Sequence, residues 1–517
     1  MRMTNKIMRN NSLYNINQNK LLEDKLTNQM TNQSKIARPS DDPVVAIRAL
    51  RLRSNVAHVT QYYEKNAKDA EQWLNVTSDA LKTIGDILED LYKQSTSAAN
   101  KDLTADDLDI LLTQMKSLTK EFYASGNVDY AGRYIFSGYR TDTAITFSAE
   151  DIAEMKRHPV SYEITEKLGF SDIDSFNFTD YSALSKTITG DGVDTDGTSY
   201  EQGITNTKLY RLRLSYDSLD GVVKDPNDNT TIISPSFKDA DGNTLDIEEY
   251  TNAEEAYRDI ANGKFKGIAY IPSTGELVFS QDFYQTNFKE GENYEVTYEK
   301  SNWIEGDINP VHYFECTETK DIGSGKTKTT IYNTTATTLP QDIYYDVGFN
   351  QKIQVNTLTS EVFTHNVQRD MDDFQRCLMQ LRGIETQISD ITKKRNEFPE
   401  DSDDYKNWNK KLEAAEKAAS YIRDNIHTQF ENQITKYQNY INDTNVANTS
   451  NAARGSRLDL ISTRLCNQQA TFKDLQTDNE SIDVTQAAVE LSSAELIYQA
   501  ALMATGKIMQ TNLMNYI

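Results

Sequence analysis

The chain has 517 residues, and its 54 Lys and Arg against 78 Asp and Glu give a formal net charge of −24 at pH 7. So acidic a chain argues against general nucleic-acid binding, because affinity for the phosphate backbone needs a basic surface. The sequence has no run of about 18 apolar residues that could cross a membrane, so we expect neither nucleic acid nor membrane as a partner.

The first 40 residues form a basic arm in this acidic chain. They hold seven Lys and Arg against Glu23 and Asp24, a net charge of +5. Apolar residues are sparse between Ile7 and Met30, so we expect a helix that is not stable alone. A solvated basic tail is the alternative.

A joint follows the arm in the segment KIARPSDDPV, residues 35–44. Ser40, Asp41 or Asp42 can accept a free amide hydrogen bond at a helix start, and Pro43 fits the first helical turn. The segment predicts either a simple helix cap or a hinge that also contacts neighbouring molecules.

Two helices are predicted next. Apolar residues recur at three- and four-residue spacing from Trp73 to Leu91 and again from Ala105 to Phe122, where Gly126-Asn127 ends the pattern. The segment 132–147 then has the aromatic residues and glycine of a β-hairpin.

The middle of the chain, about 150–350, is rich in Gly, Asp, Asn, Thr and Tyr. Alternation at 210–216 and two short apolar runs around the turn Pro272–Gly275 predict antiparallel strands. A short helix is expected at 252–261. The sequence therefore predicts a mainly α protein with an antiparallel β-rich insert in the middle.

Helical periodicity returns near residue 357. One helix is predicted from Val367 to Ile391, ending before Pro399, and a second, roughly antiparallel to it, from Trp408 to Ile441. A third is predicted through 458–475.

The last helix, from Ser481, has Asp483 and Gln486 as cap and third helical residue. Its apolar residues form two stripes, which predicts burial on two sides although the basic arm is the only obvious partner within one chain. One stripe is Val489, Leu496, Ala500, Met503, Met514, Ile517; the other is Leu491, Tyr498, Leu502, Met509, Leu513, Tyr516.

Signals for chemistry are weak. The five histidines have no metal-ligand spacing, the cysteines Cys316, Cys377 and Cys466 are isolated, and no phosphate-binding loop or nucleophile motif occurs. The runs 190–203 and 239–243 are better interpreted as polar turns than as calcium loops. We expect no catalytic residue, metal or cofactor, but a carboxylate pair in the middle segment keeps a glycan-acting enzyme as an alternative.

Several segments of the sequence resemble the bacterial flagellin family. The joint ARPSDDPVVAIRAL is similar to the family's N-terminal signature, and its Arg-Pro-Ser form is closer to the hook-filament junction members than to filament flagellin. The segments Tyr134–Gly138, Gly455–Leu458 and 481–502 are also similar to sequences of these junction members.

The resemblance implies a flagellin-like fold. The chain ends, 1–43 with 480–517, would form a coiled-coil assembly domain; 44–150 with 351–479 a helical rod with a β-hairpin; and 151–350 an outer domain. It also implies a non-enzymatic protein secreted by type III export, with an export chaperone. Such a protein would form a homo-oligomeric ring at the hook-filament junction, between the first hook-associated protein and flagellin.

We therefore expect an assembly interface in three parts of the chain. Alternatives are filament flagellin, a secreted enzyme carried on a flagellin-like scaffold, and a cytoplasmic coiled-coil scaffold. The expected interface residues are Ile7, Tyr14 and Leu21 in the arm, Arg38, Ser40, Asp41 and Asp42 in the joint, and Val489, Leu496, Leu502, Met503, Leu513 and Ile517 in the last helix.

Overall fold

The computed structural model describes residues 5–100, 103–187, 199–224, 232–239, 242–323, 326–333 and 341–510. The chain divides into two compact units, and each is treated by itself. The first unit comprises Met1–Gln72, Tyr344–Ile353 and Gly455–Ile517, and the second comprises Trp73–Ile343 and Gln354–Arg454.

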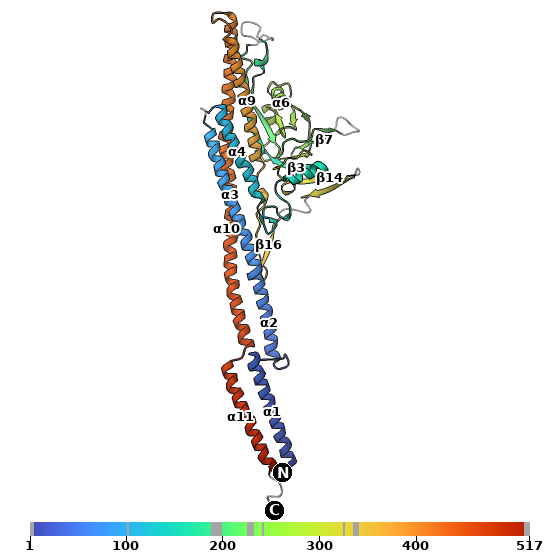
Figure 1. Cartoon of the computed structure of the whole chain (residues 1–517). Helices are drawn as coiled ribbons and strands as arrows, with labels where there is room; N and C mark the ends of the chain where they lie inside the picture. Colours follow the sequence, from blue (N-terminus) through green and yellow to red (C-terminus); the bar gives the residue numbers. More distant parts are fainter. Residues whose placement is uncertain are drawn as a thin grey trace, which may run out of the picture. The chain divides into compact units, whose positions relative to one another are not determined.

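The first unit is built from the two ends of the chain. The helices α1 and α11 lie side by side in Figure 1 and run antiparallel, because the end of α1 meets the start of α11 at a bridge between Ser34 and Ser481. The predicted helices of the arm and of the last segment are therefore confirmed. The elements are α1 (Asn5–Asn32), α2 (Pro43–Thr60), the π-helix η1 (Gln61–Ala67), the strands β16 (Tyr344–Gly348) and β17 (Gln351–Gln354), the C-terminal part of α10 (Asp403–Glu480), and α11 (Val484–Gln510).

The second unit has a helical part whose core was predicted from apolar spacing. Phe374 and Leu378 are buried, and the ring of Phe374 stacks on Phe430 with centroids 4.0 Å apart. A capping box between Thr104 and Asp107 starts α4. The helices are α3 (Lys68–Ala98), α4 (Ala105–Ala124) with the short η2 (Ser125–Asn127), α8 (Thr359–Val362), α9 (Asn366–Arg395) and the N-terminal part of α10.

The prediction of a separate third helix at 458–475 is wrong. The chain from Asp403 to Glu480 is one α-helix of 78 residues. Gly455 lies inside it, and Asn451, which is buried, donates from Nδ2 to the carbonyl oxygen of Leu74 at 2.8 Å. A tertiary contact thus holds this asparagine and glycine segment helical, although its composition favours a break.

The prediction of a hairpin over 132–147 is also wrong in position. The paired strands are β1 (Asp129–Tyr130) and β2 (Arg133–Tyr134). Ala131 and Gly132 have φ of 52° and 75°, so the turn lies before the aromatic run. The rest of the segment is mostly turns.

The middle of the chain is β-rich with mostly antiparallel strands, as predicted, and most of these strands form two large sheets. The five-stranded sheet has the order β10-β11-β12-β5-β4 and the six-stranded sheet β15-β14-β3-β13-β8-β9; their pairings are antiparallel except for β10 with β11. The predicted turn Pro272–Gly275 joins β11 to β12, and Asn252 caps the predicted short helix, α6. Asp239 closes a polar turn by accepting from the Asn243 amide at 2.7 Å, whereas residues 190–198 lie outside the described residues.

The strand and helix bounds of this region follow in chain order. They are α5 (Ala149–Arg157), β3 (Val160–Gly169), η3 (Phe170–Asp172), β4 (Ile173–Asp180), η4 (Ser182–Ser185), β5 (Thr205–Arg213), β6 (Val223–Lys224), β7 (Ile232–Ser234), β8 (Ser236–Lys238), β9 (Thr244–Leu245), β10 (Ile247–Glu249), α6 (Ala253–Ala261), β11 (Ile268–Ile271), β12 (Glu276–Phe279), α7 (Gln281–Asn287), β13 (Asn293–Lys300), η5 (Pro310–His312), β14 (Glu315–Asp321) and β15 (Thr327–Tyr332).

Candidate assembly interface

The joint between α1 and α2 is held by its two aspartates. Asp42 caps α2, and its Oδ1 accepts from the amides of Val44 and Val45 at 3.0 and 3.1 Å. Asp41 folds back, and its Oδ2 accepts from the amide of Arg38 at 2.8 Å. The side chains of Arg38 and Ser40 are exposed. The structure thus gives the aspartates a local capping role and leaves Arg38 and Ser40 at the surface.

This joint lies beside the break between α10 and α11. The amide of Lys35 donates to the carbonyl oxygen of Glu480 at 2.8 Å, and the amide of Ile482 donates to that of Gln33 at 3.3 Å. The guanidinium of Arg53 on α2 donates to the carboxylate of Glu480 at 2.9 Å. Both chain ends therefore change helix at the same level of the first unit, and backbone hydrogen bonds fix that level.

The contact between α1 and α11 is thin. On α1 the buried apolar residues are Ile16 and Leu26, and on α11 the buried residues are Ala487, Ala494 and Thr505. Small side chains allow close approach of the helices but remove little apolar surface from water. This pair accordingly gains less from burial than a helix pair joined by large side chains.

Each helix of the pair carries a second apolar stripe on its outer side. Ile7, Tyr14 and Leu21 on α1 are 48–63% exposed, and Val489, Leu496 and Met503 on α11 are 67–71% exposed. At about 100° per residue these stripes lie roughly opposite the buried residues of the same helix. We call them the α1 stripe and the α11 stripe.

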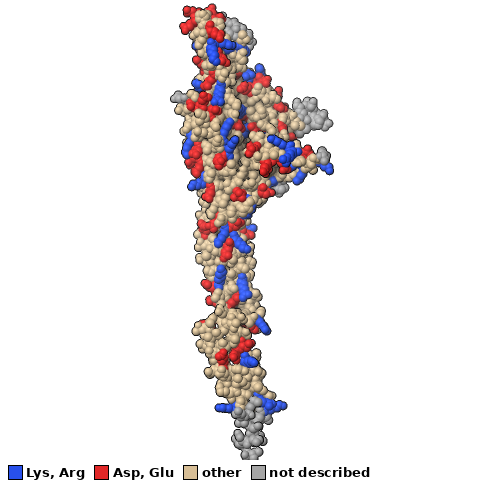
Figure 2. Space-filling view, in the orientation of Figure 1, with Lys and Arg blue, Asp and Glu red and all other residues tan. Residues whose placement is uncertain are grey.

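The two outer stripes share one period. In each, residues seven positions apart are separated by about two helical turns, so they line up along the helix as in the seam of a coiled coil. Figure 2 shows only scattered charged side chains on the visible face of the pair formed by α1 and α11. Such stripes are suited to further helices packing from outside.

The remaining predicted interface residues are placed less simply. Leu502, which belongs to the other predicted stripe of the last helix, is 45% exposed, whereas Leu513 and Ile517 lie outside the described residues. On α2 the sequence analysis missed three exposed apolar side chains, Val44, Ile47 and Leu50. Their spacing of three residues was the available signal.

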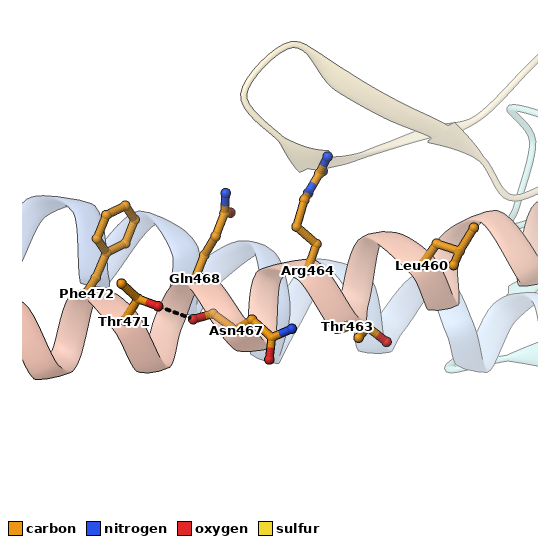
Figure 3. Close-up of a pocket in the computed structure, with 7 residues that line it drawn as sticks. All are labelled: Leu460, Thr463, Arg464, Asn467, Gln468, Thr471 and Phe472. Carbon is orange, nitrogen blue, oxygen red and sulfur yellow. Dashed lines mark hydrogen bonds between the residues drawn. The ribbon is translucent and has the colours of Figure 1, made fainter.

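A groove lies on the C-terminal part of α10. It has a volume of about 560 Å³ and is lined by Leu460, Arg464, Gln468 and Phe472 together with Thr463, Asn467 and Thr471. Figure 3 shows Arg464, Gln468 and Phe472 projecting toward the side on which a β-hairpin lies. The guanidinium of Arg464 donates to Gln351 of β17, so this hairpin borders the groove.

Two buried acids of the second unit, Glu276 and Asp373, form structural ion pairs. Arg211 of β5 donates to Glu276 of β12 at 2.7 Å and to Asp373 of α9 at 2.5 Å, and Arg376 donates to Glu276 at 2.8 Å. Burial raises the pKa of Glu276, but Arg376 and Arg211 together lower that pKa to about 2. The acid stays ionised and paired, and the cluster fixes the sheet to α9.

Burial keeps the side chains of His365, Cys316 and Cys377 uncharged at neutral pH. Burial lowers the pKa of His365 to about 3, and its Nε2 lies 3.1 Å from the hydroxyl of Tyr216. Burial raises the pKa values of Cys316 and Cys377 to about 12 and about 11, so their thiols stay protonated at neutral pH. All three cysteines are free thiols.

Two kinds of feature are absent from the described part of the chain. There, no group of three or more His, Cys, Asp or Glu side chains is placed to hold a metal ion. No helix over the same residues is long and apolar enough to cross a membrane.

Comparison with known proteins places the N-terminal part of the chain. Residues 3–141, which include α2, α3 and α4, match the family described as the bacterial flagellin N-terminal helical region. Flagellar hook-associated protein 3 of Escherichia coli K12 is 29% identical over 151 residues, 29% of this chain and 47% of that protein. The protein of the same name in Salmonella typhimurium LT2 is 28% identical over 145 residues, 28% of this chain and 45% of that protein. The chain thus matches less than half the length of each relative.

Two solved structures align over most of the chain at low identity. Xanthomonas campestris FlgL aligns over 82% of this chain and 98% of its own at 11% identity and a TM-score of 0.28. A putative flagellar hook-associated protein from Vibrio parahaemolyticus aligns over 83% and 100% at 11% identity and a TM-score of 0.26. The predicted resemblance to the flagellin family is confirmed by the sequence matches.

Proposed function

We propose that this chain is a structural component of the bacterial flagellum, the junction protein that joins the hook to the flagellin filament. The observation that carries the proposal is the pair of outer stripes on α1 and α11. Each is apolar and exposed in the single chain, and each repeats every seven residues. Burial of such stripes between copies would stabilise an assembly and requires no catalytic group.

In this proposal the copies form a ring. The first hook-associated protein contacts the ring on the hook side and flagellin contacts it on the filament side. The chain reaches this place by type III export with the help of an export chaperone, and it is secreted without acting as an enzyme. The sequence similarity to hook-associated protein 3 supports this choice, although it spans only part of that protein.

We propose a separate role for each of three parts of the chain. Segments 1–43 and 480–517 form the assembly domain, 44–150 with 351–479 the rod, and 151–350 an outer domain. The residues proposed for assembly are those of the α1 and α11 stripes with Leu502, Leu513 and Ile517, flanked by the joint residues Arg38, Ser40, Asp41 and Asp42. The capping bonds of Asp41 and Asp42 support a positioning role for the joint.

Filament flagellin is the second candidate, because the N-terminal match is to a flagellin region. The two candidates differ in where the protein lies. Immunogold labelling of sheared flagella should place a junction protein as one band at the hook-proximal end of each filament. Labelling along the whole filament would instead support flagellin, and the absence of label from flagella would overturn both.

A further inference from the structure

The tip of the hairpin formed by β16 and β17 presents an isolated aromatic ring. Phe349 is 87% exposed, the highest value among the large apolar side chains that the structure describes. A phenylalanine side chain carries about 150–250 Å² of surface, which is unfavourable to leave in water. A single exposed apolar side chain is ordinary by itself, so the weight of Phe349 comes from its setting on a hairpin that borders a groove with a second exposed apolar side chain, Leu460.

Contacts on both sides of the tip hold the backbone that carries this ring. Val347 and Ile353 on either side of the tip are buried, and Asn350 takes a φ of 54° in the tight turn. The side chain of Asn66 on η1 donates to the carbonyl oxygen of Asp346 at 2.7 Å. A ring on a fixed support loses little conformational freedom when it binds, which suits it to act as an anchor.

The groove on α10 is a matching receptor on the same unit. Leu460 is 75% exposed at one end of it and Phe472 lies at the other, with Arg464 and Gln468 between them. Its lining contains no Asp or Glu. The guanidinium of Arg464 would attract the face of an aromatic ring, whose π-electrons make it negative.

We propose that Phe349 of one copy inserts into the α10 groove of a neighbouring copy of this chain. Within one chain the ring stays in solvent, so the hairpin does not fill its own groove although it borders it. A contact between two different surfaces of identical copies is head-to-tail, and it closes into a ring where the rotation between copies allows it. This inference rests on the proposed function, because it requires copies to assemble side by side.

Disulfide trapping between two differently tagged chains tests the contact. Both chains carry Cys466→Ser, since Cys466 is exposed on the same helix. One carries Phe349→Cys and the other Gln468→Cys, and they are co-expressed in a strain without the native copy. After mild oxidation with copper-phenanthroline, flagella isolated from these cells should contain a disulfide dimer bearing both tags. Ala470→Cys, exposed on α10 but outside the groove, is the matched control and should give no mixed dimer.

A second measurement covers failure of the cysteine variants to assemble. Phe349→Ala and Phe349→Leu chains compete with the wild-type chain for incorporation into flagella, each measured relative to its exported pool. We expect at least a fivefold loss for Phe349→Ala and partial recovery for Phe349→Leu.

The outcomes separate the two proposals. Equal incorporation of Phe349→Ala, or flagella that assemble without the mixed dimer, would overturn this contact while leaving the junction function standing. Absence of the wild-type chain from flagella would overturn the proposed function and this inference with it.

Discussion

Truncating Leu496 tests whether the α11 stripe is an interface between molecules. Complete burial of a leucine side chain is worth about 1.5–3 kcal/mol, and Leu496 is 71% exposed in the single chain. Assembly can therefore still gain about 1–2 kcal/mol from this side chain. Since 1.4 kcal/mol is a factor of ten in an equilibrium constant, Leu496→Ala should weaken each contact roughly tenfold.

The same substitution should leave the isolated chain unaffected. Leu496 contributes little to the folded monomer, and alanine favours the helix, so the free energy of unfolding should change by no more than about 0.5 kcal/mol, as for ordinary surface substitutions. Ile16→Ala is the contrasting variant, because Ile16 is buried against α11. Its loss should cost about 2–5 kcal/mol locally and speed hydrogen exchange in both α1 and α11 of the monomer.

The assay is competitive incorporation. Tagged Leu496→Ala and wild-type chains are co-expressed, and their ratio in isolated flagella is compared with their ratio in the exported pool. We expect the variant at about one tenth of the wild-type level. Equal incorporation, with melting and exchange unchanged, would refute the reasoning that this stripe is buried on assembly.

Three further predictions concern the single chain. Phe374→Ala should destabilise the second unit by about 3–5 kcal/mol, whereas Lys393→Ala on the surface of α9 should cost under about 0.5 kcal/mol; urea unfolding compares them, and equal small losses would contradict the assigned core. The pKa of Glu276 lies below its value in the unfolded chain, so the stability that its ionised carboxylate contributes is present above about pH 5 and is lost as the pH falls toward 2. In thermal melts, the melting temperature of Glu276→Gln should therefore fall less steeply with decreasing pH than that of the wild type. The exposed Glu416→Gln should behave as the wild type does. In the verified monomer, amides of α1 and α11 should exchange faster than those of α9, because their contact is thin; equal protection measured by mass spectrometry would argue that the ends are stable without partners.

Much of the helical architecture could be predicted because local signals agree with burial. The apolar spacing of α3, α4 and α9 and the caps at Asp42 and Asp483 act within a few residues, and the structure keeps them. The continuity of α10 could not be predicted, since Gly455 weakens a helix locally. The contact that holds the segment joins Asn451 to Leu74, far away in the chain.

The candidate site was predictable in its pattern but not in its partners. The seven-residue period of the α11 stripe is visible in the sequence, but which stripe faces α1 depends on the fold. The ion cluster joins Arg211, Glu276 and Asp373 over distances of 65 to 162 residues. The exposure of Phe349 depends on which hairpin residues the first unit covers, and the sequence around it indicates only a turn.

The central claim is that the α1 and α11 stripes build the ring that joins the filament to the hook. It is tested most directly by comparing two variants that carry the same added charge, one on the α11 stripe and one away from it. In a strain lacking the native copy, Leu496→Asp with Met503→Asp is compared with Gln486→Asp and Ala504→Asp, which add the same charge at exposed positions of α11 about 80° around the helix from the stripe. We predict that both proteins are folded and exported, but that the stripe variant leaves hooks without filaments and flagellin in the medium. Normal filaments on cells with the stripe variant would contradict the account.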